Sequence, residues 1–98
     1  LMEDIIYFNE LYDLYGELLT DKQRSYFEDY YFNNLSFSEM AENYEVSRNA
    51  IFKQIHIVTD KLNEYEQILK LYEKKKLIME ISNSVSDENI KKQLEELF

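Results

Sequence analysis

A short stretch of the sequence carries the side-chain types and spacing with which proteins contact nucleic acids: Arg48, Asn49, Phe52, Lys53 and His56. Steps of one and four residues place them on one side of a helix. Arg and Asn recognise base edges, Lys and His contact phosphates, and an aromatic ring can meet a thymine methyl group. Four of these residues, Arg48, Asn49, Phe52 and His56, also have a simpler role. The first two suit the solvated first turn of a helix, Phe52 suits packing or a protein contact, and His56 suits an ordinary surface position.

A second group of cations surrounds an aromatic residue further along the chain and comprises Lys70, Tyr72, Lys74, Lys75 and Lys76. Lysines can meet RNA phosphates while a nearby ring stacks on a base. The alternative is a solvated helix face, because Glu66 and Lys70 form a favourable pair four residues apart.

Enzymatic chemistry has no support in the sequence. There is no cysteine, His56 is the only histidine, and no glycine-rich phosphate loop occurs. The carboxylates are scattered at positions that suit solvated helix faces, and no metal-ligand spacing stands out. We therefore expect a non-enzymatic protein without a cofactor or a metal.

Three N-cap signals predict the helices that position the first group. Residues 20–23 and 36–39 each match a capping box, in which two side chains satisfy backbone N–H groups reciprocally. Ser47 suits the N-cap of the following helix. The spacing of these starts is typical of a helix-turn-helix over residues 18–62, and an ordinary three-helix bundle is the alternative.

The composition predicts an all-α fold and a single domain over residues 1–98, since Pro is absent and Gly occurs once. The expected helices span residues 2–19, 21–32, 37–43, 48–81 and 87–98. The fourth is long because no stop signal precedes residues 82–84. No apolar run reaches the roughly 20 residues that span a bilayer, and no signal-peptide pattern is present. A cytoplasmic protein is expected.

The long helix carries apolar residues at alternating steps of four and three, at Ile51, Ile55, Val58, Leu62, Tyr65, Leu69 and Tyr72. This is a heptad seam of the kind that pairs helices in coiled coils. It fits packing within the chain, a homodimer, or a division in which the far half, from Ile68 to Ile81, meets a second subunit or another protein. A symmetric dimer would place two recognition helices one turn of DNA apart.

The net charge of −9 opposes strong DNA binding. The first 35 residues hold eight acids against Lys22 and Arg24, and residues 36–62 hold four acids against three bases. Duplex affinity rises with the number of phosphates neutralised, and an acidic body repels a polyanion. Binding to DNA is therefore expected to be weak and easily lost as salt rises.

The motifs in residues 19–24 (LTDKQR), 35–42 (LSFSEMAE) and 46–51 (VSRNAI) resemble the promoter-reading C-terminal domain of bacterial sigma factors over residues 18–62. Two departures from that pattern weaken DNA binding. Glu45 occupies the turn position where the pattern has glycine in a left-handed conformation, at a cost of about 1 kcal/mol. Where sigma domains place bases along the recognition helix, this chain carries Phe52, Ile57, Thr59 and Asp60.

A resemblance over nearly the whole chain is to the YlxM family of small bacterial proteins. It rests on residues 7–15 (YFNELYDLY), 18–23 (LLTDKQ), the aromatic segment 26–32 and residues 46–52 (VSRNAIF). The resemblance implies an all-helical protein with a sigma-like helix-turn-helix. It also implies a regulatory role with the signal recognition particle, through that particle's protein or its RNA, because the family's genes lie beside the gene of its GTPase. A dimeric, sequence-specific transcription regulator is the alternative.

Overall fold

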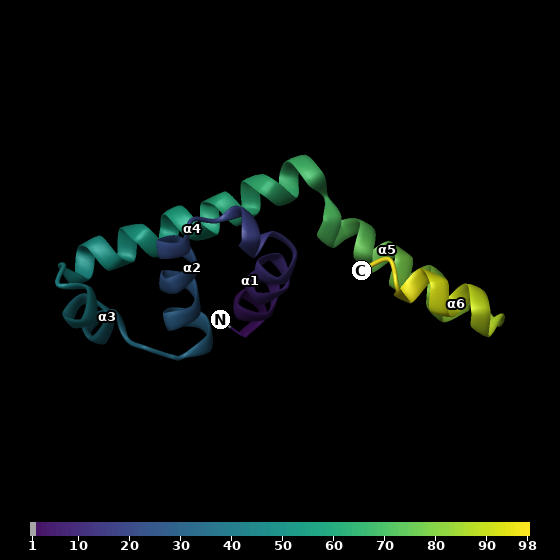
Figure 1. The fold of residues 1–98 in the computed structure, drawn as a ribbon, viewed down its shortest axis with the longest axis horizontal. Coiled ribbons are helices and arrows are strands. Elements are labelled where there is room, and N and C mark those ends of the chain that lie inside the picture. The colour runs from purple at the N-terminus through teal and green to yellow at the C-terminus, as the bar shows by residue number, and fades with distance from the viewer. Residues whose placement is uncertain (1) are drawn as a thin grey trace.

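The computed structural model describes residues 2–98 and, over that range, contains six α-helices and no β-strand. The helices are α1 (Met2–Tyr15), α2 (Asp21–Phe27), α3 (Phe37–Tyr44), α4 (Arg48–Leu69), α5 (Leu71–Ser84) and α6 (Glu88–Glu95). Figure 1 shows α4 lying across α1, α2 and α3, while α5 and α6 form a hairpin that projects from the end of α4. We call residues 2–69 the body and residues 70–98 the arm. The all-α prediction is confirmed.

The predicted N-caps start the helices of the body. Thr20 Oγ1 accepts from the N–H of Gln23 at 3.2 Å, and Gln23 Oε1 accepts from the N–H of Thr20 at 3.0 Å. Ser36 and Glu39 repeat this exchange at 3.1 and 3.0 Å. These bonds satisfy N–H groups that the first helical turn leaves without partners, so the starts of α2 and α3 are defined locally.

Two helices of the body end earlier than predicted and continue in tighter or wider turns. A 3-10 turn (Gly16–Leu18) follows α1, and a π-helical turn (Glu28–Phe32) follows α2. Gly16 lies close to the Tyr12 ring, so that a Cβ at this position would come within 3.1 Å of it and the ring would have to shift slightly. That ring in turn stacks on Phe27, with centroids 4.3 Å apart, so the missing side chain lets the end of α1 close on α2.

The core of the body consists of two clusters that share α4. The first joins α1 to α2 and the second half of α4, and it contains Leu11, Tyr12, Tyr15, Leu19, Phe27, Val58 and Leu62. The second joins α2 and α3 to the first half of α4, and it contains Tyr26, Met40, Ala41, Ile51 and Ile55. The heptad seam is therefore covered within the chain as far as Leu62, whereas Leu69 is 41% exposed.

The predicted helix over residues 48–81 is interrupted at Lys70, which corrects the expectation of one unbroken helix. Lys70 adopts a left-handed conformation with φ 56°, so α4 ends at Leu69 and α5 starts at Leu71. The freed N–H groups find acceptors in the body. The Leu71 N–H donates to the Tyr15 hydroxyl at 3.0 Å, and the Tyr72 N–H donates to the Glu66 carboxylate at 2.9 Å.

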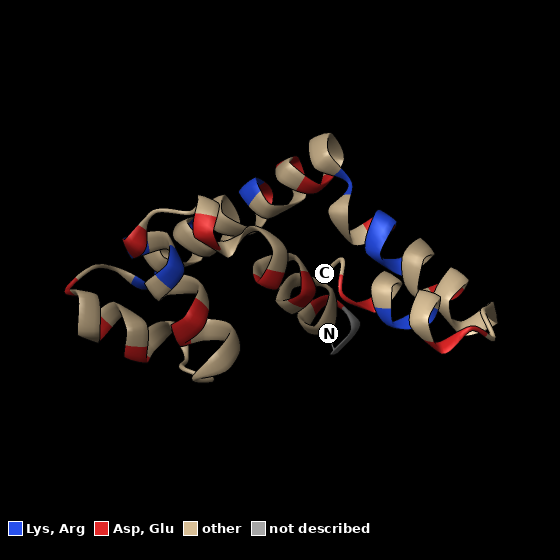
Figure 2. Cartoon of the chain, turned by 45° about the vertical axis from the view of Figure 1, so that its right-hand side comes forward, with Lys and Arg blue, Asp and Glu red and all other residues tan. Residues whose placement is uncertain are grey.

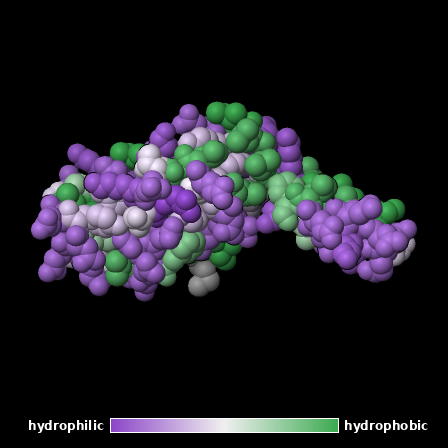
Figure 3. All heavy atoms as spheres, in the orientation of Figure 1, coloured by the Kyte–Doolittle hydropathy of each residue, from purple (hydrophilic) through white to green (hydrophobic). Residues whose placement is uncertain are grey.

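The arm buries little. Among its residues only Ser82 is fully buried, and its hydroxyl lies 3.4 Å from Glu95 Oε1. Asp87 caps α6, since its carboxylate accepts from the N–H groups of Asn89 and Ile90. The arm's large exposed apolar residues are Leu77, Met79, Ile81, Ile90, Leu97 and Phe98. Figure 3 shows hydrophobic residues along its upper edge and around the end of α4.

Candidate nucleic-acid or partner interface

The turn of the helix-turn-helix is left-handed at Glu45, the position where the sigma-type pattern has glycine. Glu45 has φ 57° and ψ 44°. The Val46 N–H bonds to the Ala41 carbonyl at 3.0 Å and the Glu45 N–H to the Glu42 carbonyl at 3.3 Å, which is the Schellman arrangement of a helix end. A glutamate in this conformation costs about 1 kcal/mol relative to glycine.

Tyr44 fastens that turn to the rest of the body. Its hydroxyl donates to Asp29 Oδ2 at 2.6 Å, and its ring lies 4.6 Å from the ring of Tyr26 between centroids. Burial, and then the bond to Asp29, raise the pKa of Tyr44 to about 12. Val46, which follows the left-handed Glu45, is 42% exposed and leaves the closing of the turn to Tyr44. The tyrosine therefore fastens the end of α3 to α2 and to the π-helical turn.

The five residues proposed to contact nucleic acid all lie on the exposed part of α4, but they do not form one uniform surface. Ser47 caps α4 by accepting from the Ala50 N–H at 3.0 Å. Arg48, Asn49 and Lys53 are exposed to solvent near this end. Phe52 and His56 are exposed as well, yet their rings contact each other, with centroids 4.4 Å apart. Phe52 also meets an aromatic ring of α3, at Phe37.

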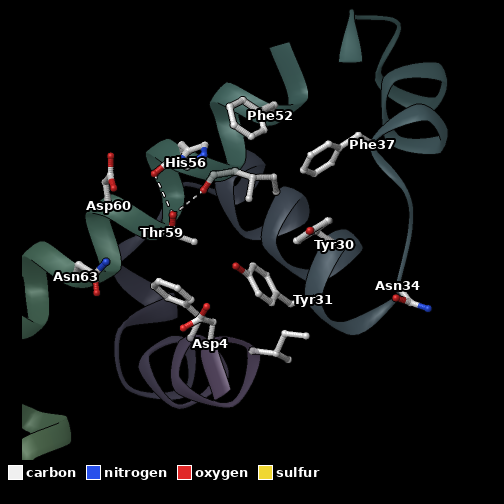
Figure 4. A pocket seen from close by; sticks show the side chains of 13 residues that line it. Asp4, Tyr30, Tyr31, Asn34, Phe37, Phe52, His56, Thr59, Asp60 and Asn63 are labelled. Atoms are coloured by element: carbon white, nitrogen blue, oxygen red, sulfur yellow. Dashed lines mark hydrogen bonds between the residues drawn. The ribbon is translucent and has the colours of Figure 1, made fainter. Parts of the chain in front are cut away.

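A hollow of about 560 Å³ opens beside Phe52 and His56, between α1, the π-helical turn, α3 and α4 (Figure 4). We call it the aromatic hollow, after the rings that line it: Phe8, Tyr30, Tyr31, Phe37, Phe52 and His56. Asp4 and Asp60 also line it. Burial raises the pKa of Tyr31 to about 12, and the charges of Tyr30 and Asp4 add to the effect. The Thr59 hydroxyl donates to the backbone carbonyls of Ile55 and His56.

The charge around α4 is unfavourable for a polyanion on this side. The residues that line the aromatic hollow include two aspartates and neither lysine nor arginine. The cations Arg48 and Lys53 are not among them. A phosphate backbone could therefore approach the tip of the body only along the side that carries Arg48, Asn49 and Lys53.

The second predicted patch lies on the arm next to α1. Lys75 Nζ pairs with Glu10 Oε2 at 3.7 Å, and Lys76 Nζ lies 5.5 Å from the centroid of the Tyr72 ring. The same ring meets Tyr7 edge-on at 5.3 Å. These contacts occupy part of the patch. Lys70 and Lys74, whose side chains are exposed, are the cations that it presents to solvent.

Charge differs sharply between the two parts of the chain. Residues 1–69 hold fourteen acids against five bases, which is the whole net charge of −9, whereas residues 70–98 hold six of each. Figure 2 shows basic residues on α5 and at the neighbouring bend, as well as on α6 and the body. The arm is therefore the part of the molecule that a polyanion can approach with least repulsion.

Within residues 2–98, no group of three or more His, Cys, Asp or Glu side chains is placed to hold a metal ion. Over the same described range, no helix has both the length and the apolar character needed to cross a membrane.

The sequence did not predict the aromatic hollow, nor that the Glu66 carboxylate would accept hydrogen bonds at the break between α4 and α5. A partial signal existed, since Phe52, His56 and Asp60 follow one another at steps of four residues on α4. Asp4 and Phe8 show the same step on α1. The pattern could not reveal that these two rows face each other.

Comparison with known proteins supports the helix-turn-helix fold. A family model, UPF0122, described as "Putative helix-turn-helix protein, YlxM / p13 like", matches residues 2–98. A UPF0122 protein of Ureaplasma urealyticum serovar 10 is 44% identical over 91 residues, which cover 93% of this chain and 92% of the relative. A UPF0122 protein of Shouchella clausii is 37% identical over 92 residues, covering 90% of this chain and 84% of the relative.

Proposed function

Because this chain belongs to the UPF0122 family of YlxM/p13-like helix-turn-helix proteins, we propose that it is a non-enzymatic accessory protein of the signal recognition particle, acting in the cytoplasm. The proposed contacts are with the particle's protein or with its RNA. The proposal follows from the YlxM resemblance of the sequence. Its structural support is the surface of α4, where the exposed residues Phe52, Ile57 and Asp60 occupy positions at which sigma domains carry bases.

Two surfaces are available for these contacts. The tip of the body presents Arg48, Asn49 and Lys53 beside exposed aromatic rings, a mixture that suits a protein partner. The arm presents Lys70 and Lys74 on a segment without net charge, which suits RNA phosphates. The two surfaces are at opposite ends of α4, so their contributions can be separated by mutation.

The test is a competition experiment. The immobilised full chain is offered the particle's GTPase, the particle's RNA and duplex genomic DNA fragments together, at moderate salt. We expect the GTPase or the RNA to be retained. Failure to retain either of them would overturn the proposal.

Variants then assign the contact. Loss of RNA with Lys70→Ala/Lys74→Ala would place the contact on the arm, with a salt dependence shallower by about 0.7–0.9 per phosphate contact removed. Loss of the GTPase with Arg48→Ala/Lys53→Ala would place it at the tip. Lys91→Ala/Lys92→Ala removes two cations from α6 and is the control.

The second candidate is a dimeric, sequence-specific DNA-binding regulator. Its support is the capped helix-turn-helix with Arg48, Asn49 and Lys53 exposed at the start of α4, together with the exposed apolar residues of the arm that a second copy could cover. Gel shifts should then show a discrete DNA site whose affinity falls on Arg48→Ala, and sedimentation should show a dimer. No shift below micromolar protein at low salt would exclude this candidate.

A further inference from the structure

The arm rests on α1 through a small contact. The Tyr72 ring meets the Tyr7 ring edge-on, with centroids 5.3 Å apart, and Lys75 Nζ lies 3.7 Å from Glu10 Oε2. Leu71 packs against the edge of the core of the body. Leu71, Tyr72 and Lys75 are all half-buried, so the contact encloses none of them completely. Because burial of apolar surface is the main source of stability, little free energy holds α5 against α1.

A groove in the packing lies beside this contact. It has a volume of about 350 Å³, lies between α1 and α5, and is lined by Ile6 and Met79 among others. Ile6 is 57% exposed and Met79 is 40% exposed, so apolar side chains of both helices are open to solvent here. Protein interiors are normally close-packed, and an interface with an open groove loses few contacts when its two sides separate.

Lys70 is the pivot between the two parts of the chain. It is the single residue between α4 and α5, and its left-handed conformation, with φ 56° and ψ 31°, makes the bend seen in Figure 1. This conformation is unfavourable for lysine, and hinges are typically a few residues at the ends of elements. The Tyr15 hydroxyl and the Glu66 carboxylate hold the bend by accepting from the N–H groups of residues 71–73. Release of the arm costs these bonds but relieves the strain at Lys70.

The docked position of the arm covers part of its cationic patch. Glu10 pairs with Lys75, while Tyr7 and Lys76 contact the Tyr72 ring. Single-stranded nucleic acids bind where cations meet phosphates and an aromatic face meets a base. A released arm would add the Lys75 charge and the uncovered side of the Tyr72 ring to the lysines already exposed. It would also carry them away from the carboxylates of α1.

We propose that the contact between α5 and α1 is autoinhibitory, and that single-stranded RNA binds the arm after it has pivoted away from α1 at Lys70. The released arm is the minor form without RNA, and RNA shifts the population towards it. This inference rests on the proposed contact of the arm with RNA. It adds regulation to that contact, because a change that weakens the hold of Tyr15 or Glu10 on α5 raises the affinity for RNA.

The position of the arm is measured by double electron–electron resonance between two spin labels. The chain has no cysteine, so Glu42→Cys on α3 and Gln93→Cys on α6 place one label at an exposed position of the body and one on the arm. The labelled chain should show one main distance, and saturating single-stranded oligouridine RNA should add a second. If bound RNA left the distances unchanged, it would bind the docked arm and the proposal would be wrong.

Tyr15→Phe tests the hold on the arm without a change of charge. It removes the acceptor of the Leu71 N–H and leaves the buried ring in place. We expect a released fraction about 2- to 5-fold larger and an RNA affinity tighter by the same factor, because the apparent dissociation constant varies inversely with the fraction of the binding-competent form. The control is Tyr65→Phe, which removes a hydroxyl bonded to the Leu18 carbonyl and should change neither quantity. A released fraction or an affinity equal to that of the parent chain would contradict the proposal.

A second pair of variants tests the ion pair. Glu10→Gln frees Lys75, whereas Asp13→Asn removes one charge from an exposed position of the same helix. Glu10→Gln should tighten the binding of oligouridine about 2-fold more than Asp13→Asn does. Equal changes would reduce the effect to net charge and overturn autoinhibition alone. RNA that bound neither the parent chain nor any variant would overturn the proposed contact of the arm with RNA.

Discussion

The body and the arm are both helical and both begin their helices with defined caps or acceptors, but they bury very different amounts of apolar surface. The body encloses residues such as Phe27, Met40 and Leu62 completely. The arm encloses only Ser82, and it exposes large apolar side chains such as Leu77 and Ile81. The comparison shows that local helix signals do not distinguish a self-sufficient unit from one that relies on its neighbours, because stability comes mainly from burial.

Charge follows the same division. The acidic residues in excess all belong to residues 1–69, while the remainder of the chain is neutral. A neutral, apolar and lysine-bearing arm on an acidic body suits contacts with partners that the body would repel. The exposed apolar residues and lysines of the arm are therefore the surface features that packing within the chain explains least.

The difference in burial between the body and the arm is tested most directly by replacing one leucine with alanine in each part. Leu62→Ala, in the body, should lower the free energy of unfolding by about 2–5 kcal/mol, because Leu62 is fully buried. Leu77→Ala, in the arm, should cost less than about 0.5 kcal/mol, because Leu77 is 52% exposed. Urea unfolding measures both. Equal costs would mean that the arm is covered in solution.

The junction between the two parts gives a smaller effect. The Glu66 carboxylate accepts from the N–H groups of Tyr72 and Glu73, and from the Tyr15 hydroxyl at 2.6 Å. Glu66→Ala leaves these donors without that acceptor, so we expect a loss of about 1–3 kcal/mol. Hydrogen exchange at the Tyr72 and Glu73 amides should accelerate.

The matched control at the junction is Glu64→Ala, which removes an exposed carboxylate two residues away on α4. It should leave both stability and exchange unchanged. If Glu66→Ala left the two amides as protected as in the parent chain, the carboxylate would not be what holds α5 against the body.

Alkaline pH should loosen the body through three tyrosines that are buried or half-buried. Burial is the main cause that raises the pKa values of Tyr15, Tyr31 and Tyr44 to about 12. An unfolded tyrosine ionises near pH 10, so the stability that neutral phenols contribute is complete below about pH 10 and lost as pH rises towards 12. Urea unfolding over this range, with phenolate absorbance, measures the loss. Tyr31→Phe should lose less stability than the parent chain, and parallel curves would contradict this assignment.

The smallest expected effect concerns the left-handed turn at Glu45, compared with a helical position in the same part of the body. Glu45→Gly should raise the free energy of unfolding by up to about 1 kcal/mol, because glycine adopts the left-handed angles of the turn without strain. Glu42→Gly, inside α3, should instead lower it by about 0.5–1 kcal/mol. Thermal unfolding of the pair measures both signs, and a loss on Glu45→Gly would mean that its side chain makes a contact worth more than the strain.

The candidate site was predictable only in part. The cap at Ser47 and the helical spacing correctly placed Arg48, Asn49 and Lys53 on an exposed face, since both signals act within one helix. Their contacts with nucleic acid stay a prediction. The aromatic hollow was not predictable, because it joins Asp4 and Tyr31 to Asp60 across more than half of the chain.

The sequence by itself determined the starts of α2, α3 and α4 and the buried face of α4 as far as Leu62. These features depend on residues within a few positions of one another, where hydrogen bonds and helical periodicity act directly. Only the tertiary structure decided the break at Lys70. No glycine or proline marks it, and acceptors from Tyr15 and Glu66 make it possible. The same holds for the direction of the arm and for the hollow, because both arise where separate helices meet.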